Sequence, residues 1–454
     1  MTRDVDKASG NLFHYIPNTQ EERREMLRTL GIDAVDELFA DIPAELRNPP
    51  LDLPDPLSEL ELRREMEGLA AQNRHTSGRP SFLGAGAYNH FSPSIVRSII
   101  SRGEFLTAYT PYQPEVSQGT LQATYDFQTM VCELLGMEVA DAGMYDGASS
   151  LAEAALMACR ITGRGSVAVL NGVSPLYRQV IDTYVEPQGI EVRELDADQV
   201  QMPPDMACLI VQYPNFFGYL EDLASLERVA HDSGALLVVS ANPVAMGLLR
   251  PPGQYKADIV TGEGQALGIP LSFGGPYVGL LATRQQYVRQ MPGRIAGRTV
   301  DSQGRTGYVL TLSTREQHIR RERATSNICT NQALMTLAAT VYLAALGKTG
   351  LRQVAELSYH KAHYAASLIG NIPGFSLPFQ GTFFNEFTVQ CPAPPEEINR
   401  RLLARDIIGG LDIGHLIPDS MLLCVTEMNT RQEMDSLVAV LSEFSVADKV
   451  RSDG

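Results

Sequence analysis

The chain has 454 residues, 44% of them hydrophobic, and this length predicts two or three packed units rather than a single core. Its formal net charge of -16 argues against a nucleic-acid groove or an anionic membrane surface, because both would need clustered lysine and arginine. The most basic run, residues 315–323, carries Glu316 and Glu322 between its arginines, and we interpret it as a solvated or interdomain face.

The six cysteines lie far apart and form no C-x-x-C pair, so neither zinc-site spacing nor a secreted disulfide framework is indicated. A reducing, cytoplasmic location is therefore expected. Residues 1–10 lack the apolar core that a signal peptide requires. No apolar run is expected to reach membrane-spanning length, so we expect a soluble protein.

Residues 1–80 are predicted to form a polar helical arm. Two hydroxyl residues stand three positions before a glutamate, in the pairs Thr19 with Glu22 and Ser58 with Glu61. Side chains at this spacing can accept hydrogen bonds from two free backbone amides, which marks a helix start. The prolines of residues 48–56 predict an extended connector between the two helices. Two interpretations stay open: an arm wrapped over a neighbouring chain, or a mobile surface leader.

Residues 81–330 are predicted to form a large α/β domain. Apolar periodicity predicts helices at 92–100, capped by Ser92 and Pro93, and at 121–136. Short apolar runs without alternation predict strands buried on both faces, at residues 167–170, 208–211, 236–239, 259–261 and 277–281. Such strands indicate a mostly parallel sheet flanked by helices.

Residues 331–454 are predicted to form a smaller C-terminal α/β domain. Its first element is a long apolar helix that ends at Gly347 and is followed by a second helix. Strands are expected near residues 384–389 and 422–426, and further helices at 396–405 and 431–444.

No lysine stands between Asp258 and Leu346. Residues 257–283 resemble the aldehyde-binding loop of a pyridoxal-phosphate enzyme from which the reactive lysine is missing. Lys256 precedes the strand that a Schiff-base lysine should follow, and we interpret it as solvent-facing. The pattern therefore indicates one subunit of an enzyme whose reactive lysine belongs to another polypeptide.

A second catalytic group is missing after the strand at 236–239. A pyridoxal enzyme normally places a carboxylate there, because a negative charge keeps the ring nitrogen protonated. This chain offers Ser240 or Asn242 instead. Neither side chain can hold that proton electrostatically.

A candidate phosphate cradle precedes the apolar helix that starts near Leu151. Gly147 permits close backbone approach, and Ser149 and Ser150 supply hydroxyl donors beside the free amides of the helix start. A serine-capped helix without a ligand explains the same residues equally well. Downstream, Tyr213 and Asn215 could contact a ligand at the sheet edge, although a turn shaped by Asn215 is the favoured interpretation.

Two polar loops are expected to line a site. Residues 107–120 are dense in hydroxyls, amides and prolines, which are costly to bury unless their polar atoms find partners or a ligand. Residues 323–331 place small donors before a helix, where capping is an equal alternative. The candidates are Tyr109, Tyr112, Gln113, Glu115, Ser117, Gln118, Thr325, Ser326 and Asn327.

Longer motifs carry a family resemblance that covers nearly the whole chain. They are FLGAGAYNHFSPS, TAYTPYQPEVSQGTLQATYDFQTMVCELLGM, MYDGASSLAEA, PNFFGYLED and the run from PGRIAGRTV to ICTNQAL, at residues 82–94, 107–137, 144–154, 214–222 and 292–334. Together they resemble subunit 1 of decarboxylating glycine dehydrogenase, the N-terminal half of the P-protein of the glycine cleavage system.

The resemblance implies a type I pyridoxal-phosphate-dependent transferase-like fold and an active site shared with subunit 2, whose lysine holds the cofactor. Glycine would lose its carboxylate there, and the aminomethyl group would pass to the lipoyl group of the H-protein, in a pair of heterodimers. Residues 109–118 would reach the partner's substrate, and residues 325–327 would touch its cofactor phosphate. The chain's own pocket around Gly147, Ser149 and Ser150 would be vestigial.

Three alternatives stay open. The chain could be a self-sufficient enzyme that binds pyridoxal phosphate without a covalent bond through the Ser149 loop. It could also be a scaffold that only docks the lipoyl protein. The third, a decarboxylase of another amino acid, is disfavoured by the missing lysine.

Overall fold

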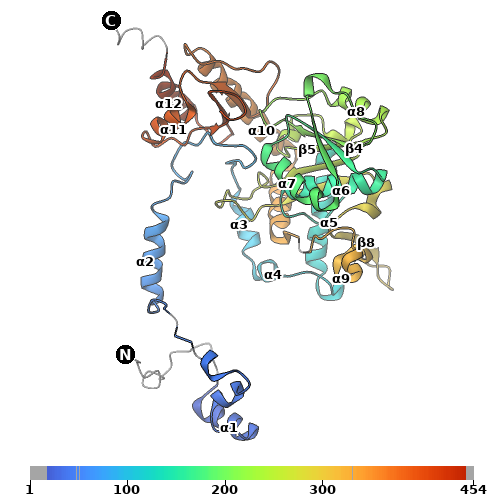
Figure 1. Cartoon of the computed structure of the whole chain (residues 1–454), viewed down its shortest axis with the longest axis vertical. Helices are drawn as coiled ribbons and strands as arrows, with labels where there is room; N and C mark the ends of the chain where they lie inside the picture. The colour runs from blue at the N-terminus through green and yellow to red at the C-terminus, as the bar shows by residue number, and fades with distance from the viewer. Residues whose placement is uncertain (1–17, 48, 51, 330, 446–454) are drawn as a thin grey trace. The chain divides into compact units, whose positions relative to one another are not determined.

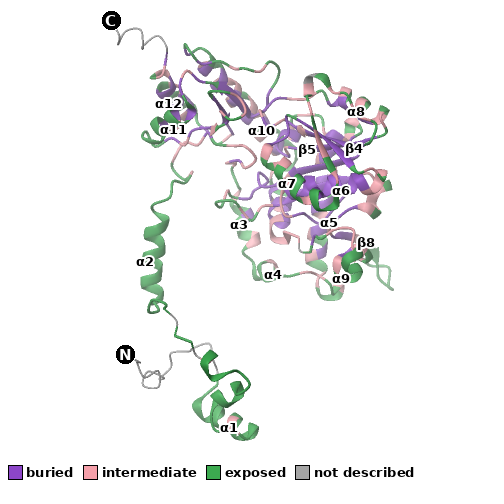
Figure 2. Cartoon of the chain, viewed as in Figure 1, coloured by how far each residue is buried: buried purple, intermediate pink, exposed green. Residues whose placement is uncertain are grey.

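A computed structural model describes residues 18–47, 49–50, 52–329 and 331–445. The chain divides into two compact units after Arg74. In the first unit, α1 (Gln20–Leu30) and α2 (Glu59–Ala70) begin with the predicted capping boxes at Thr19 and Ser58. The described residues between them form short 3-10 turns and extended backbone. No residue of α1 or α2 is buried, and both helices are almost entirely green in Figure 2.

The second unit is built on a seven-stranded sheet of order β1-β7-β6-β5-β4-β2-β3. Two of its strands, β4 and β5, are labelled in Figure 1. Strands β2 to β6 run parallel to one another, whereas β7 is antiparallel to both β6 and β1. The strand bounds are β1 (Val139–Ala140), β2 (Ser166–Leu170), β3 (Glu191–Leu195), β4 (Met206–Tyr213), β5 (Leu236–Ala241), β6 (Ile259–Glu263) and β7 (Gly279–Thr283). All five predicted strands are present, and the mostly parallel sheet is confirmed.

Helices cover both faces of this sheet. Along β4, Leu209 packs in one hydrophobic core with residues of α5, α8 and α10, while its neighbour Ile210 packs in another with residues of α6 and α7. Successive side chains of a strand point to opposite faces, so the two cores lie on opposite sides of the sheet. The helix bounds are α5 (Gln118–Leu135), α6 (Gly147–Thr162), α7 (Pro175–Val185), α8 (Leu223–Asp232) and α10 (Ala333–Gly370).

The second unit also contains three short helices and a two-stranded hairpin outside the main sheet. α3 (Ser94–Ile100) begins at Pro93 without a side-chain cap, and the Ser92 hydroxyl donates instead to the Gly268 carbonyl (2.9 Å), so the predicted serine cap is wrong. α4 (Gly103–Leu106) and α9 (Gln317–Arg320) are single turns. An unpredicted hairpin joins β8 (Ile295–Val300) to β9 (Thr306–Thr311).

The helix α10 is 38 residues long and is interrupted at Gly347, which has φ 60° and ψ -173°. The two predicted helices are thus one long element with a break at the predicted position. Among the described residues, α10 is also the one helix long and apolar enough to cross a membrane by length and composition alone, so the expectation that no apolar run would reach that length is wrong. Its inward residues, such as Tyr342 and Ile369, are part of the hydrophobic cores.

A three-stranded antiparallel sheet of order β10-β12-β11 follows α10. It contains β10 (Glu386–Gln390), β11 (Leu411–Asp412) and β12 (Ser420–Cys424), and it packs with α11 (Pro395–Leu403) and α12 (Arg431–Ser442) around a third core. Phe82 is fully buried in that core, and its amide donates to the Ile408 carbonyl (2.9 Å). The segment before α3 therefore joins the C-terminal sheet. The boundaries at 80 and 330 stay predictions.

Candidate active site

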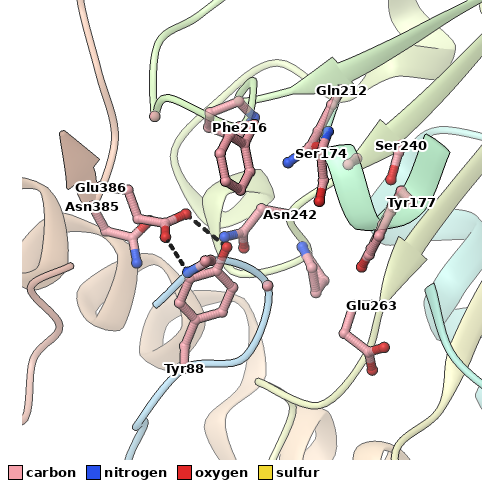
Figure 3. Close-up of a pocket in the computed structure, with 16 residues that line it drawn as sticks. Tyr88, Ser174, Tyr177, Gln212, Phe216, Ser240, Asn242, Glu263, Asn385 and Glu386 are labelled. Atoms are coloured by element: carbon pink, nitrogen blue, oxygen red, sulfur yellow. Dashed lines mark hydrogen bonds between the residues drawn. The ribbon is translucent and has the colours of Figure 1, made fainter. Parts of the chain in front are cut away.

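A pocket opens at the carboxyl ends of β4, β5 and β6, where open α/β sheets place their ligands (Figure 3). The last residues of these strands supply an amide, a hydroxyl and a carboxylate, those of Gln212, Ser240 and Glu263. The start of α7 adds Ser174 and Tyr177. Asn385 lies directly before β10, and Glu386 is the first residue of that strand. No lysine, arginine or histidine is among the lining residues.

The predicted phosphate cradle lies beside this pocket, but its donors already have protein partners. The Gly147 amide donates to Glu263 Oε2 (2.9 Å) and the Ser149 amide to Asp146 Oδ1 (2.7 Å). The hydroxyls of Ser149 and Ser150 donate to Asp146 as well. The helix is thus capped by Asp146 rather than by a serine. Two carboxylates stand where an anion would have to bind.

Burial changes the acidity of the two carboxyls that line the pocket. Glu263 accepts from the amides of Gly147 and Gln265, yet burial raises its pKa to about 8. Glu386 accepts from the Ala85 amide (2.6 Å) and from the Tyr88 hydroxyl (2.7 Å), and burial raises its pKa to about 7 (Figure 3). Both groups therefore carry protons over part of the neutral range.

The end of β5 agrees with the predicted loss of a carboxylate. Ser240 is buried and lines the pocket. Asn242 shapes the backbone that follows, because its Oδ1 accepts from the amides of Val244 (3.0 Å) and Ala245 (3.3 Å). Neither residue brings a negative charge to this position.

Three other residues singled out in the sequence have structural rather than ligand-binding surroundings. Asn215 Oδ1 accepts from the amides of Phe217 (3.1 Å) and Tyr219 (3.0 Å), so it shapes the turn after β4. Tyr213 is buried within β4. The Lys256 side chain is 71% exposed and pairs with Glu227 (3.2 Å), which confirms it as solvent-facing.

The loop before α5 places most of its predicted residues at the surface. Tyr109 is 75% exposed, and Gln113 and Glu115 are exposed too, while Ser117 precedes α5 without capping it. Gln118 is instead a brace: its Nε2 donates to the Tyr308 carbonyl (2.8 Å), and its Oε1 accepts from the Tyr308 amide (2.8 Å).

The second predicted loop folds over α6. The Ser326 hydroxyl donates to Glu153 Oε1 (2.7 Å) and accepts from the Ile328 amide (3.0 Å). The Thr325 amide donates to the Arg315 carbonyl (3.1 Å), and the Asn327 carbonyl accepts from Gln317 Nε2 (3.4 Å). Arg315 turns inward and donates to the Gly293 carbonyl (3.0 Å), whereas residues 318–323 are exposed, so the interpretation of residues 315–323 as a solvated or interdomain face fits the end of the run but not Arg315.

Arg294, which sequence reasoning missed, joins the two loops. Its Nη2 donates to the Tyr112 hydroxyl (3.1 Å), its Nε pairs with Glu316 Oε2 (3.2 Å), and its Nη1 donates to Asn331 Oδ1 (3.4 Å). The rings of Tyr112 and His318 meet edge to face at 5.4 Å. Arg294 therefore bridges the two loops that were predicted separately. The available sequence signal was a charged residue directly before the buried Ile295 and Ala296.

Comparison with known proteins gives the family. The model of the family described as glycine cleavage system P-protein matches residues 13–441. The chain belongs to the P-protein family of the glycine cleavage system. A relative from Thermomicrobium roseum is 55% identical over 443 residues, covering 94% of this chain and 99% of the relative, and is named probable glycine dehydrogenase (decarboxylating) subunit 1. One from Desulforamulus reducens with the same name is 53% identical, covering 95% of this chain and 100% of the relative.

Solved structures agree on the P-protein fold. One described as glycine decarboxylase (P-protein) of the glycine cleavage system, in inhibitor-bound form, has a TM-score of 0.91 and 46% identity over 95% of this chain and 99% of that chain. Lactobacillus brevis glutamate decarboxylase shares the fold alone, at a TM-score of 0.64 and 14% identity over 88% of this chain and 96% of that chain. The predicted family and the type I pyridoxal-phosphate fold class are confirmed.

The pocket of this P-protein subunit does not fit pyridoxal phosphate, although the fold is that of enzymes using this cofactor. The cofactor's phosphate would face Asp146 and Glu263 at the start of α6, where the amide donors of Gly147 and Ser149 are engaged. Residues 257–347 contain no lysine for a covalent bond to the aldehyde. The chain thus has the architecture of such an enzyme without the groups that bind its cofactor.

Proposed function

We propose that this P-protein subunit completes an active site whose pyridoxal phosphate is held covalently by a lysine of a second polypeptide, subunit 2. One observation carries the proposal. Asp146 and Glu263 accept the hydrogen bonds of the backbone amides at the start of α6 that a cofactor phosphate would need, and no lysine lines the pocket. A subunit that cannot bind the cofactor but keeps the whole fold serves the reaction by contributing surface to a partner. The assembly would be a pair of heterodimers in the cytoplasm.

The reaction would be the decarboxylation of glycine, with transfer of the aminomethyl group to the lipoyl group of the H-protein. The cofactor supplies an electron sink when bound to the partner. This chain would supply positioning and hydrogen bonding in trans through Tyr109, Tyr112, Gln113, Glu115, Ser117 and Gln118. Thr325, Ser326 and Asn327 would lie against the partner's cofactor phosphate.

The contacts between the loops support this division of labour. Tyr112 is held by the buried Arg294, so its ring and hydroxyl are fixed before a partner binds. Tyr109 and Glu115 stay exposed and are available to a ligand on another chain. Groups held in place by packing lose little freedom when they meet a substrate, which favours catalysis.

The test is complementation between purified chains. Exchange of labelled bicarbonate into glycine would be measured for this chain, for subunit 2 and for the mixture, with borohydride reduction to locate any cofactor adduct. Activity only in the mixture, with the adduct on subunit 2, is the expected result. An adduct on this chain alone would overturn the proposal.

Two variants separate a contribution to the site from mere docking. Tyr109→Phe and Glu115→Gln should lower exchange at saturating partner, whereas Glu186→Gln, an exposed change at the end of α7, should not. If Tyr109→Phe and Glu115→Gln weakened only the affinity for the H-protein and left turnover per complex intact, the chain would be a docking scaffold instead.

A further inference from the structure

The pocket at the carboxyl ends of β4, β5 and β6 is lined by buried residues with polar atoms that make no hydrogen bond. Ser174 and Ser240 are each 4% exposed and Asn385 is 2% exposed. Within the described chain, the hydroxyls of the two serines and the side-chain oxygen of Asn385 make no hydrogen bond, yet all three residues line the pocket. The residues are buried, but these three polar atoms face the pocket rather than the packed interior. These atoms are therefore placed to bind something that enters the pocket.

The shape and lining suit a small polar molecule. The pocket is small, with a cavity volume of about 40 Å³, and it is partly open to solvent. Around that space lie the hydroxyl of Tyr177 and the amides of Gln212 and Asn242, which Figure 3 shows facing the same region as Ser174 and Ser240. Sites of this kind take small ligands that are oriented by a few placed polar groups.

The charges in the pocket select for a cation. Glu263 and Glu386 are the charged lining residues, and no basic side chain lines the pocket beside them. When these carboxyls are deprotonated they repel an anion, whereas an ammonium group has three donors and no acceptor and so pairs well with a carboxylate.

Glu263 is the better ion partner of the two. Its oxygens accept from backbone amides at 2.9 Å, while Glu386 is held by shorter bonds at 2.6 and 2.7 Å, one of them from the Tyr88 hydroxyl. Glu263 also ends β6, next to the strand that carries Ser240.

We propose that this pocket binds a small amino alcohol, with the ammonium group paired to Glu263 and the hydroxyl bound by Ser174, Ser240 or Asn385. The site is separate from the catalytic site proposed on the partner. The subunit would therefore exist in a free and a ligand-bound form. The inference does not depend on the proposed function, since it concerns this chain's pocket alone.

The probe is ethanolamine, titrated by isothermal calorimetry into the full chain without subunit 2 and in a buffer free of Tris. Ethylene glycol is the uncharged comparison, and inorganic phosphate and pyridoxal phosphate are the anionic ones. Saturable binding of one ethanolamine per chain is expected, at least tenfold tighter than any of the comparisons. Its affinity should rise from pH 6.5 to 8.5, because an ammonium ion binds the deprotonated Glu263 whose pKa burial raises to about 8.

Two variants assign the site, and far-ultraviolet circular dichroism establishes that each is folded. Glu263→Gln should weaken ethanolamine at least tenfold, and Ser240→Ala should weaken it several-fold with the charge intact. Glu186→Gln should change nothing. If Glu263→Gln fails to fold, Ser240→Ala and the series of comparison ligands still decide.

Three results would overturn the inference. They are no saturable ethanolamine binding, equal binding of ethylene glycol, and ethanolamine binding that Ser240→Ala and a folded Glu263→Gln leave unchanged. Because subunit 2 is absent, failure of the complementation experiment does not affect this measurement.

Discussion

At the scale of single residues, Arg294 is the charged side chain on which the predicted site loops depend. It is 6% exposed and its partner Glu316 is 7% exposed, at 3.2 Å. Removing one member of a buried ion pair leaves the other charge without compensation, which costs about 3–5 kcal/mol. Replacing both members by neutral groups can cost much less, because no isolated charge stays buried.

Arg294→Met should therefore lower the free energy of unfolding by about 3 kcal/mol or more. The double variant Arg294→Met/Glu316→Gln should recover a large part of that loss. Urea denaturation of the isolated chain gives both values. Arg305→Met, which removes the exposed pair with Asp301 at 2.8 Å, is the matched control and should leave the urea midpoint unchanged. Equal losses in the single and double variants would contradict the role assigned to the pair.

A second residue-scale prediction concerns Glu386. Burial raises its pKa in the folded chain to about 7 from 4.5. Between these values the unfolded chain releases a proton that the folded chain keeps, so the folded state binds more protons and its stability falls as pH rises. The contribution of this one group falls by roughly 3 kcal/mol from below pH 4.5 to above pH 7.

Glu386→Gln removes that proton linkage while keeping the acceptor for the Ala85 amide. The variant should therefore gain stability relative to the parent chain as pH rises from 5 to 8, with most of the change between pH 5 and 7. Urea midpoints at pH 5, 6, 7 and 8 measure the difference. A constant difference between variant and parent at all four values would show that Glu386 has no raised pKa.

At the scale of elements, α10 depends on the glycine at its interruption. Gly347 has φ 60° and ψ -173°, a conformation essentially restricted to glycine. A Cβ added there would meet no atom within 4 Å, so any cost must come from the backbone. Gly347→Ala should reduce stability by about 1–3 kcal/mol. Gly370→Ala is the control in the same helix, because it is equally free of neighbours but has no positive φ.

Gly370→Ala should be neutral or stabilising by roughly 0.5 kcal/mol, since alanine favours helix more than glycine does. Thermal unfolding followed by circular dichroism compares the two variants. If both substitutions had the same effect, backbone strain at Gly347 would not be the cause.

The elements predicted from the sequence are those whose signals are local. Capping at Thr19 and Ser58 and the buried runs of β4 and β5 depend on neighbours in the chain, and the structure has all of them. The edge strand β3, by contrast, has three charged residues among its five and none of them is buried, so a search for uninterrupted apolar runs passes over it. The β8–β9 hairpin was missed for a similar reason, since most of its residues are not buried.

The parts of the candidate site that the sequence did not predict depend on contacts between residues far apart in the chain. Glu263 reaches the Gly147 amide across 116 positions of the sequence, and Arg294 reaches Tyr112 across 182. No spacing rule connects residues so far apart. The absence of the lysine could be predicted because it is a property of composition, whereas the carboxylates that occupy the α6 donors could only be found in three dimensions.

At the scale of the whole molecule, the first unit has an unexplained apolar surface. In α2, Leu62, Met66 and Leu69 recur at helical spacing and are about half exposed, and no residue of the helix is buried. Exposed apolar side chains gathered on one helix face mark an interaction surface. The arm predicted to wrap over a neighbour would bury this face against subunit 2.

The double variant Met66→Lys/Leu69→Lys should therefore weaken association with subunit 2, because two charges would have to be buried in the complex. It should leave the thermal midpoint of the isolated chain unchanged, since neither side chain packs within α2's own unit. Analytical ultracentrifugation of the mixture and calorimetry of the single chain measure the two effects. Arg64→Gln lies on the opposite face of α2 and is the matched control. If the double variant assembled as tightly as the parent, the face would not be the contact, and a lowered midpoint of the isolated chain would mean that α2 packs against its own chain instead.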